Sequence, residues 1–205
     1  MSLLIIDRDT VHDLLPMVDC IALMRQAMIA LSTGQTRQLL RQIIGLDEGA
    51  AFGVMPGVSA ETFGAKLISV YPGNFAKGLQ SHQGCVALFD PATGDIVAML
   101  HAGEITAIRT AAASAAATKV LARPNARRLA ILGYGEQALT HARAIALVRP
   151  LGEIGEVFSG AKVGRADRMD VTVYKSLGAV VQDLFSGWHI YRQALAKGRG
   201  VVVPF

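Results

Sequence analysis

Charged residues are scarce in this chain. Asp, Glu, Lys and Arg together make up 18% of its 205 residues, whereas soluble domains ordinarily carry about 25%. Apolar residues reach 52%, which excludes a disordered tail, because such a tail lacks the apolar residues that form a core. We expect part of the apolar excess to be buried between subunits, because large exposed apolar patches are rare on monomers.

Long apolar runs and a basic leader are also missing. No stretch reaches the roughly 18 consecutive apolar residues that suggest a membrane-spanning helix. The first acid, Asp7, is reached with no basic residue before it, which is not typical of a signal peptide. We therefore expect no membrane partner.

The chain also has few cysteines and a small net charge. Cys20 and Cys85 are the two cysteines, and neither has a nearby Cys or His at metal-ligand spacing. We therefore expect buried, reduced thiols, no metal site and a cytoplasmic protein. The 20 Lys and Arg exceed the 16 Asp and Glu by a net charge of +4 without forming a basic block. This balance argues against a nucleic-acid partner.

The apolar periodicity predicts an α/β fold. A capped turn is expected at 7–15, and the segment Met55-Pro56-Gly57 is expected to separate two short strands within 51–71. A turn at 90–95 predicts a hairpin between its flanking strands. The other predicted strands are 3–6, 37–44, 86–89, 96–100, 129–132 and 171–174, and the predicted helices are 18–32, 106–121, 138–148 and 177–195.

The segment Gly133-Tyr134-Gly135-Glu136-Gln137-Ala138 follows a predicted strand and opens a predicted helix. This is the phosphate-binding pattern of dinucleotide folds, in which the first glycine makes a tight turn and the second lets the backbone approach a pyrophosphate. The alternative is a plain turn between a strand and a helix. The fold also needs an acid about 20 residues further on, after a second strand. Glu153 and Glu156 have that distance but follow no apolar strand, so we interpret both as loop residues.

Three cations lie on mostly apolar segments. Arg109 is expected in the first turn of the 106–121 helix, where the helix dipole disfavours a cation unless an anion lies nearby. Lys66 has an alternative interpretation as an edge-strand lysine that blocks aggregation, and any one of these cations is more often solvated than functional. Together, Arg41, Lys66 and Arg109 could converge on a carboxylate, which Arg binds in a bidentate manner.

Two histidines are candidate acid–base groups. His82 and His101 each lie beside a predicted strand, where a structural role is the more frequent alternative. The Ala-rich stretch 111–117 predicts a close-packing helix surface.

These residues occur within longer motifs. These motifs are Gly64-Ala65-Lys66-Leu67-Ile68-Ser69-Val70-Tyr71-Pro72, Ser81-His82-Gln83-Gly84, Leu88-Phe89-Asp90, Thr93-Gly94, the run from Glu104 to Ala112, Gly133 to Ala138, and Val173 to Gly178. In these motifs the chain resembles the ornithine cyclodeaminase and mu-crystallin family over about residues 1–150, and again from Gly155 to the end.

The resemblance implies a mixed-sheet substrate and dimerisation domain built from both chain ends, residues 1–124 and 155–205. Residues 125–154 would be a truncated Rossmann-type βα unit. The expected partners are a small amino or imino acid and a second copy of the chain. By resemblance, the substrate site comprises Arg41, Lys66, Arg109, Ser176, Leu177 and Gly178, with Lys66 also placed for proton transfer. The NAD or NADP site comprises Thr110, Gly133, Gly135, Glu136, Gln137 and Ala138.

The chain departs from the family between Ile154 and Gly155. Most of the nucleotide domain is missing there, on the order of a hundred residues, including the strand with the ribose-selecting residue and an aspartate that acts on the substrate. We hypothesise an internal deletion, natural or engineered, or the joining of two segments that are separate in the natural chain.

A second departure concerns the reaction. True cyclodeaminases, by the family pattern, carry a glutamate just ahead of Met-Pro, whereas this chain has Ala51-Phe52-Gly53-Val54 before Met55. The resemblance then favours reduction of a cyclic imino acid, such as pyrroline- or piperideine-2-carboxylate, over ornithine cyclodeamination. The alternatives are a non-catalytic, dimeric binding protein like mu-crystallin and an inactive truncated remnant.

Overall fold

The computed structural model describes residues 2–123, 131, 135–148, 159–160 and 180–204. Within these residues the chain forms an eight-stranded mixed sheet with the order β2-β4-β5-β6-β7-β1-β8, and β3 also pairs with β4. The strands are β1 (Ser2–Ile6), β2 (Arg37–Gln38), β3 (Gln42–Gly45), β4 (Ala51–Val58), β5 (Phe63–Val70), β6 (His82–Phe89), β7 (Ile96–His101) and β8 (Val201–Pro204).

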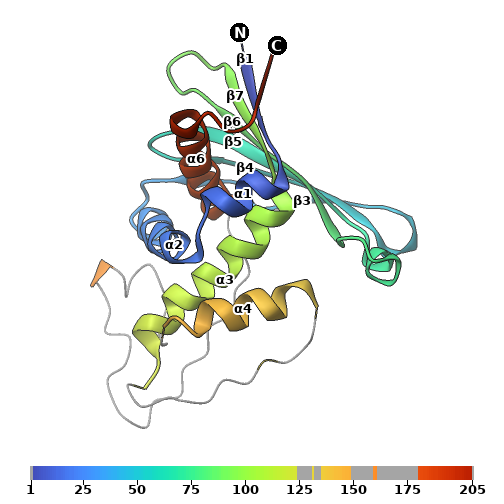
Figure 1. The fold of residues 1–205 in the computed structure, drawn as a ribbon, viewed down its shortest axis with the longest axis vertical. Coiled ribbons are helices and arrows are strands. Elements are labelled where there is room, and N and C mark those ends of the chain that lie inside the picture. The colour runs from blue at the N-terminus through green and yellow to red at the C-terminus, as the bar shows by residue number, and fades with distance from the viewer. Residues whose placement is uncertain (1, 124–130, 132–134, 149–158, 161–179, 205) are drawn as a thin grey trace.

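The helices lie against one side of this sheet, as Figure 1 shows. Helices α3 and α6 contact strands β5 and β6, and α2 packs on both helices. The described helices are α1 (Arg8–Leu14), α2 (Met17–Ser32), α3 (Ala102–Leu121), α4 (Glu136–Ile145) and α6 (Val180–Lys197), and short 3-10 turns span Asp47–Gly49 and Pro72–Lys77.

Both chain ends contribute strands to the same part of the sheet. Strand β1 pairs parallel with β7, with Ile5 opposite Met99, and antiparallel with β8, with Leu4 opposite Val202. The two termini therefore lie next to each other in Figure 1. This confirms the expected α/β class and the mixed sheet built from both ends of the chain.

The expected break at Met55-Pro56-Gly57 is wrong, because β4 continues through it and Pro56 pairs with Ala65 of β5. On its other side, β4 pairs with β3 up to Val54 and with β2 from Gly57. Proline has no N–H to donate to a neighbouring strand, and Pro56 lies where this outer ladder is interrupted. The predicted strand 37–44 is correspondingly split, and residues 39–41 leave the sheet.

Two helix starts also differ from the prediction. The expected turn at 7–15 contains helix α1, whose N-cap Asp7 accepts a hydrogen bond from the Thr10 backbone N–H at 2.9 Å. Helix α3 begins at Ala102, where His101 Nδ1 accepts from the Glu104 backbone N–H at 3.1 Å. Arg109 therefore lies beyond the first turn, so the expected dipole conflict does not arise. His101 has a structural role as a helix cap.

Close packing around α3 follows from its small side chains. Within the predicted stretch 111–117, six alanines are buried, which confirms a close-packing helix surface.

Strand β4 and helix α6 also approach closely at Gly57, where a Cβ atom would lie 2.7 Å from Val180 Cγ1. This glycine lets the start of α6 pack directly on β4.

Cys20 is buried, as predicted, whereas Cys85 is only half-buried, and the described residues contain no disulfide bond between them. Among the described helices, none alone is long and apolar enough to cross a membrane, and α1 and α2 reach that length only together, across an 83° bend. The predicted strands 129–132 and 171–174 fall almost wholly or wholly outside the described residues, as do Gly133, Glu153, Glu156, Ser176, Leu177 and Gly178.

Candidate active site

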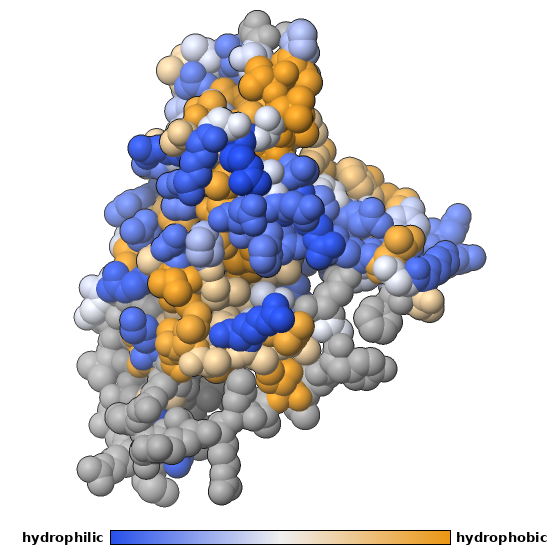
Figure 2. Space-filling view, viewed as in Figure 1, coloured by the Kyte–Doolittle hydropathy of each residue, from blue (hydrophilic) through white to orange (hydrophobic). Residues whose placement is uncertain are grey.

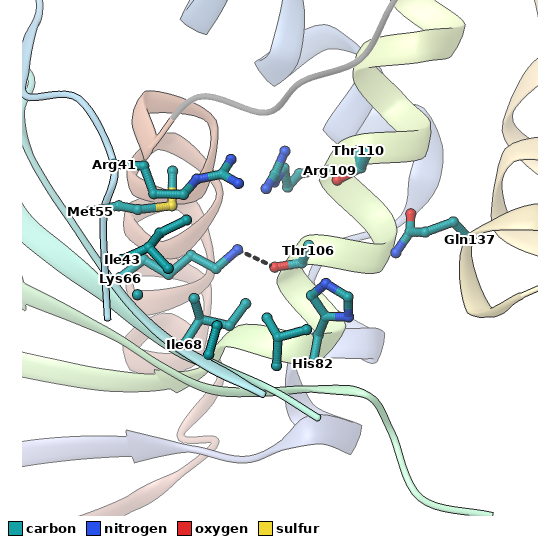
Figure 3. Close-up of a pocket in the computed structure, with 13 residues that line it drawn as sticks. Arg41, Ile43, Met55, Lys66, Ile68, His82, Thr106, Arg109, Thr110 and Gln137 are labelled. Carbon is teal, nitrogen blue, oxygen red and sulfur yellow. Dashed lines mark hydrogen bonds between the residues drawn. The ribbon is translucent and has the colours of Figure 1, made fainter. Parts of the chain in front are cut away.

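A cavity of about 250 Å³ lies between the sheet and helices α3 and α4. It brings together the three cations that the sequence singled out, Arg41, Lys66 and Arg109, which come from three separate segments (Figure 3). The other lining residues are Ile43, Ala51, Gly53, Met55, Ile68, Val70, His82, Thr106, Thr110 and Gln137.

Lys66 is an interior residue of the sheet. Strand β5 lies between β4 and β6, with Lys66 opposite Met55 and Val86, and its side chain is only 2% exposed. The edge-strand interpretation is therefore wrong. Its Nζ donates hydrogen bonds to Thr106 Oγ1 and, at 3.3 Å, to Asp183 Oδ1.

Arg109 is held by two consecutive residues of α6. Its Nε donates to Asp183 Oδ1 at 3.2 Å, and its Nη1 donates to Gln182 Oε1 at 2.8 Å. The Asp183 side chain is fully buried. A single carboxylate oxygen thus pairs with both buried cations of the cavity.

Arg41 enters the cavity from the segment between β2 and β3. Arg41 as a whole is exposed to solvent. Figure 3 shows its guanidinium directed toward that of Arg109, above the Lys66 ammonium. The interruption of pairing beside Pro56 is what allows this segment to leave the sheet and reach the cavity. The structure therefore brings together all three members of the predicted carboxylate site.

The Lys66 ammonium lies in an unfavourable electrostatic setting. Burial lowers the pKa of Lys66, and the positive charges of Arg109 and Arg41 lower it further. Asp183 opposes this shift through its charge and its hydrogen bond. An additional anion in the cavity would stabilise all three cations, and a carboxylate has the geometry that guanidinium groups bind best.

The opposite wall of the cavity is the start of α4. Its N-cap Gly135 has no side chain to cap the helix, and the positive end of the helix dipole there favours an anion. Thr110 Oγ1 and Gln137 Oε1 are buried without a hydrogen-bond partner. Of the predicted cofactor residues, Thr110 and Gln137 line the cavity, Gly135, Glu136 and Ala138 form the first turn region of α4, and Gly133 lies outside the described residues.

Three residues that bind Lys66 or Arg109 were not predicted from the sequence: Thr106, Gln182 and Asp183. Thr106 precedes Arg109 by three residues, which places both on one helix face. Gln182 and Asp183 form a polar pair inside the apolar run Val180 to Phe185. Such a pair in a buried helix indicates polar partners elsewhere in the fold. His82 lines the cavity, with its Nδ1 2.8 Å from Ser81 Oγ.

The family model for the ornithine cyclodeaminase/mu-crystallin family matches residues 2–154 and 148–198. The chain belongs to this family. The two matched segments together extend over most of the chain and overlap at residues 148–154.

The chain is similar to two curated family relatives. It is 41% identical to ketimine reductase mu-crystallin of Mus musculus over 111 residues, which cover 53% of this chain and 36% of that protein. It is 28% identical to the Delta(1)-pyrroline-2-carboxylate/Delta(1)-piperideine-2-carboxylate reductase of Azospirillum brasilense over 195 residues, 89% of this chain and 63% of that protein. The chain thus spans less than two thirds of either relative.

Among solved structures, the fold is similar to an archaeal alanine dehydrogenase dimer with bound NAD. The TM-score is 0.92 and the sequence identity 20%, with 100% of each chain covered. This likeness supports the assigned α/β fold.

The buried ammonium of Lys66 predicts a pH-dependent stability. The pKa of Lys66 in the folded chain lies below the ordinary value of 10.5. Between these two pKa values, Lys66 is less protonated in the folded chain than in the unfolded chain, so the free energy of unfolding rises with pH. We expect the wild type to gain stability relative to K66M as the pH rises from neutral toward 10.5, as measured by urea unfolding. K119M, which alters an exposed lysine of α3, should not show this relative change, and a constant difference between wild type and K66M would contradict the prediction.

Proposed function

We propose that the cavity binds the carboxylate of a small amino or imino acid. The observation that carries this proposal is the convergence of Arg41, Lys66 and Arg109 on one cavity. Its volume of about 250 Å³ is below the roughly 300–1,000 Å³ of sites for drug-sized ligands, and it therefore suits a compact substrate.

The proposed reaction is the NAD(P)-dependent reduction of a cyclic imino acid, such as pyrroline- or piperideine-2-carboxylate. The A. brasilense relative, a reductase of these two imino acids, supports this substrate class. The cavity wall also favours reduction over ornithine cyclodeamination, because Ala51 and Gly53 line it where a carboxylate for the expulsion of ammonia is expected from the family pattern. Lys66 Nζ would pair with the substrate carboxylate and hold the proton for the imine nitrogen.

A nicotinamide cofactor fits the opposite wall. Its carboxamide or phosphate groups would satisfy the buried Thr110 Oγ1 and Gln137 Oε1, which have no partner, and the uncapped start of α4 at Gly135 suits a phosphate. When bound, the cofactor supplies the hydride for the reduction. NAD and NADP are both compatible with these residues.

Two further features belong to the proposal. The exposed Ile5 of β1 and Val201 and Val202 of β8 lie in the region of the sheet where Figure 2 shows a hydrophobic surface, and such a surface supports a homodimer. A homodimer that binds small molecules without catalysis is the second candidate function. It is favoured by the extent of the match, because the aligned residues cover only 36% of the mouse ketimine reductase mu-crystallin.

We expect R109A to lose at least about tenfold in affinity for pyrrole-2-carboxylate, a stable planar analogue of pyrroline-2-carboxylate, because a charge-assisted hydrogen bond contributes about 1.5–3 kcal/mol. Isothermal titration calorimetry provides the measurement, with pyrrole-2-carboxamide as the uncharged ligand control. R37A alters an exposed arginine of β2 and should bind as the wild type does. Equal affinity of R109A and wild type would remove Arg109 from the proposed site.

The cofactor proposal predicts that NADH binds the chain and that T110V weakens binding by about fivefold, the effect of about 1 kcal/mol from one lost hydrogen bond. The fluorescence of NADH upon titration with protein measures this affinity. T140V, on the same helix as Gln137, serves as the control. No NADH binding at millimolar concentration would exclude the reductase and leave the non-catalytic binding protein.

The domain organisation completes the proposal. We infer that residues 1–124 and 155–205 form one substrate and dimerisation domain and that 125–154 are a shortened nucleotide-binding unit produced by an internal deletion. In the protein isolated from its natural source, mass spectrometry should then find a peptide in which Gly155 directly follows Ile154. Peptides with further residues between Ile154 and Gly155 would show that the two segments are separate in the natural chain.

A further inference from the structure

We propose that Asp183 is a positioning residue of the carboxylate site, which holds the Lys66 ammonium and the Arg109 guanidinium side by side so that both face one ligand carboxylate. This inference rests on the carboxylate-binding function proposed above. It assigns a role to the C-terminal helix α6, whose side chains are not among the lining residues of the cavity.

The geometry supports this role directly. Asp183 Oδ1 accepts from Lys66 Nζ at 3.3 Å and from Arg109 Nε at 3.2 Å. All three side chains are at most 5% exposed, so little water is available to replace these contacts. The shared oxygen therefore fixes the separation of the two cations.

Neighbouring contacts fix Asp183 and Arg109 in turn. Gln182 Oε1 accepts from Arg109 Nη1 at 2.8 Å, and the Gln182 amide donates to Met28 Sδ of α2 at 3.3 Å. The start of α6 is also set against β4 by the close approach of Val180 to Gly57. The Asp183 carboxylate thus lies on a rigid support rather than on a loop.

Charge supplies the second part of the role. The groups facing Lys66 are Asp183 from α6, Arg109 and the Thr106 hydroxyl from α3, and Arg41 from the segment between β2 and β3, while His82 of β6 lines the same cavity. Of these groups, Asp183 favours the charged form of Lys66, whereas burial and the two arginines disfavour it. Without the Asp183 charge, Lys66 would become a neutral amine at a lower pH.

The test uses D183N, which keeps the shape of the side chain and removes its charge. Affinity for pyrrole-2-carboxylate is measured by calorimetry from pH 6 to pH 10. We expect D183N to bind at least as tightly as the wild type at pH 6, because one negative charge beside the ligand carboxylate is removed. We expect D183N to lose affinity at a pH lower by about one unit or more, the effect of one nearby opposite charge on Lys66. S186A, which alters a buried serine of the same helix, should keep the wild-type profile.

Two results would overturn the proposal: a D183N profile that superimposes on that of the wild type, or a loss of affinity that is equal at every pH. The second result would indicate a merely structural role, because loss of packing has no reason to follow the titration of Lys66.

A double-mutant cycle in urea unfolding separates this inference from the proposed function, because it needs no ligand. We expect D183N to destabilise the chain less in the K66M background than in the wild type, since the uncompensated buried cation is then absent. Additive effects would overturn the Asp183–Lys66 link. If D183N alone does not fold, restored folding of K66M/D183N supports the link and failure of both variants overturns it. If the cycle shows coupling but the wild-type chain binds no carboxylate, the proposed function is refuted and the Asp183–Lys66 link still holds.

Discussion

The ion pairs that Asp183 makes with Lys66 and Arg109 constrain the rest of the structure. A buried carboxylate is costly unless cations and hydrogen bonds surround it, and the Asp183 side chain has no solvent exposure. Helix α6 must therefore begin next to β5 and α3, although Asp183 is 117 residues from Lys66 along the chain. The pairing of β8 with β1 secures the other end of the same C-terminal segment. The site thus depends on both ends of the chain.

Helix α3 connects this constraint to the cavity through its residue spacing. Thr106, Arg109 and Thr110 are three and four residues apart, so all three project from one face and line the cavity. The alanines of the other faces are buried against α2, α4 and α6. Small side chains let these helices approach closely, and the polar face of α3 is thereby held at a fixed distance from β5.

Local patterns sufficed to predict much of this fold from the sequence. The hairpin of β6 and β7, helices α2 and α3, and the N-terminal strand β1 follow from apolar periodicity and turn residues. Strand β8 was not predicted, because its pairing with β1 joins the two ends of the chain. The cations Arg41, Lys66 and Arg109 could be selected because each interrupts an apolar segment. Their convergence could not be derived from spacing, since it depends on how β5, α3 and the segment between β2 and β3 pack together.

The errors have specific physical causes. The proline in β4 was expected to end a strand, but Pro56 lies where the outer ladder is already interrupted, so its missing N–H is tolerated. Arg109 was assigned to a first helical turn because the cap formed by His101 Nδ1 is not evident from residue types alone. Asp183 was overlooked because an acid in an amphipathic helix ordinarily faces water, and only tertiary packing shows that this acid is buried.

Small side chains hold helix α4 against helix α3. Ala144 of α4 packs with Ala111 and Ala115 of α3. The start of α4 is therefore held by the same helix that carries Thr110 and Arg109. The packing between these two helices thus sets the position of Gln137 relative to Thr110 and Arg109 across the cavity.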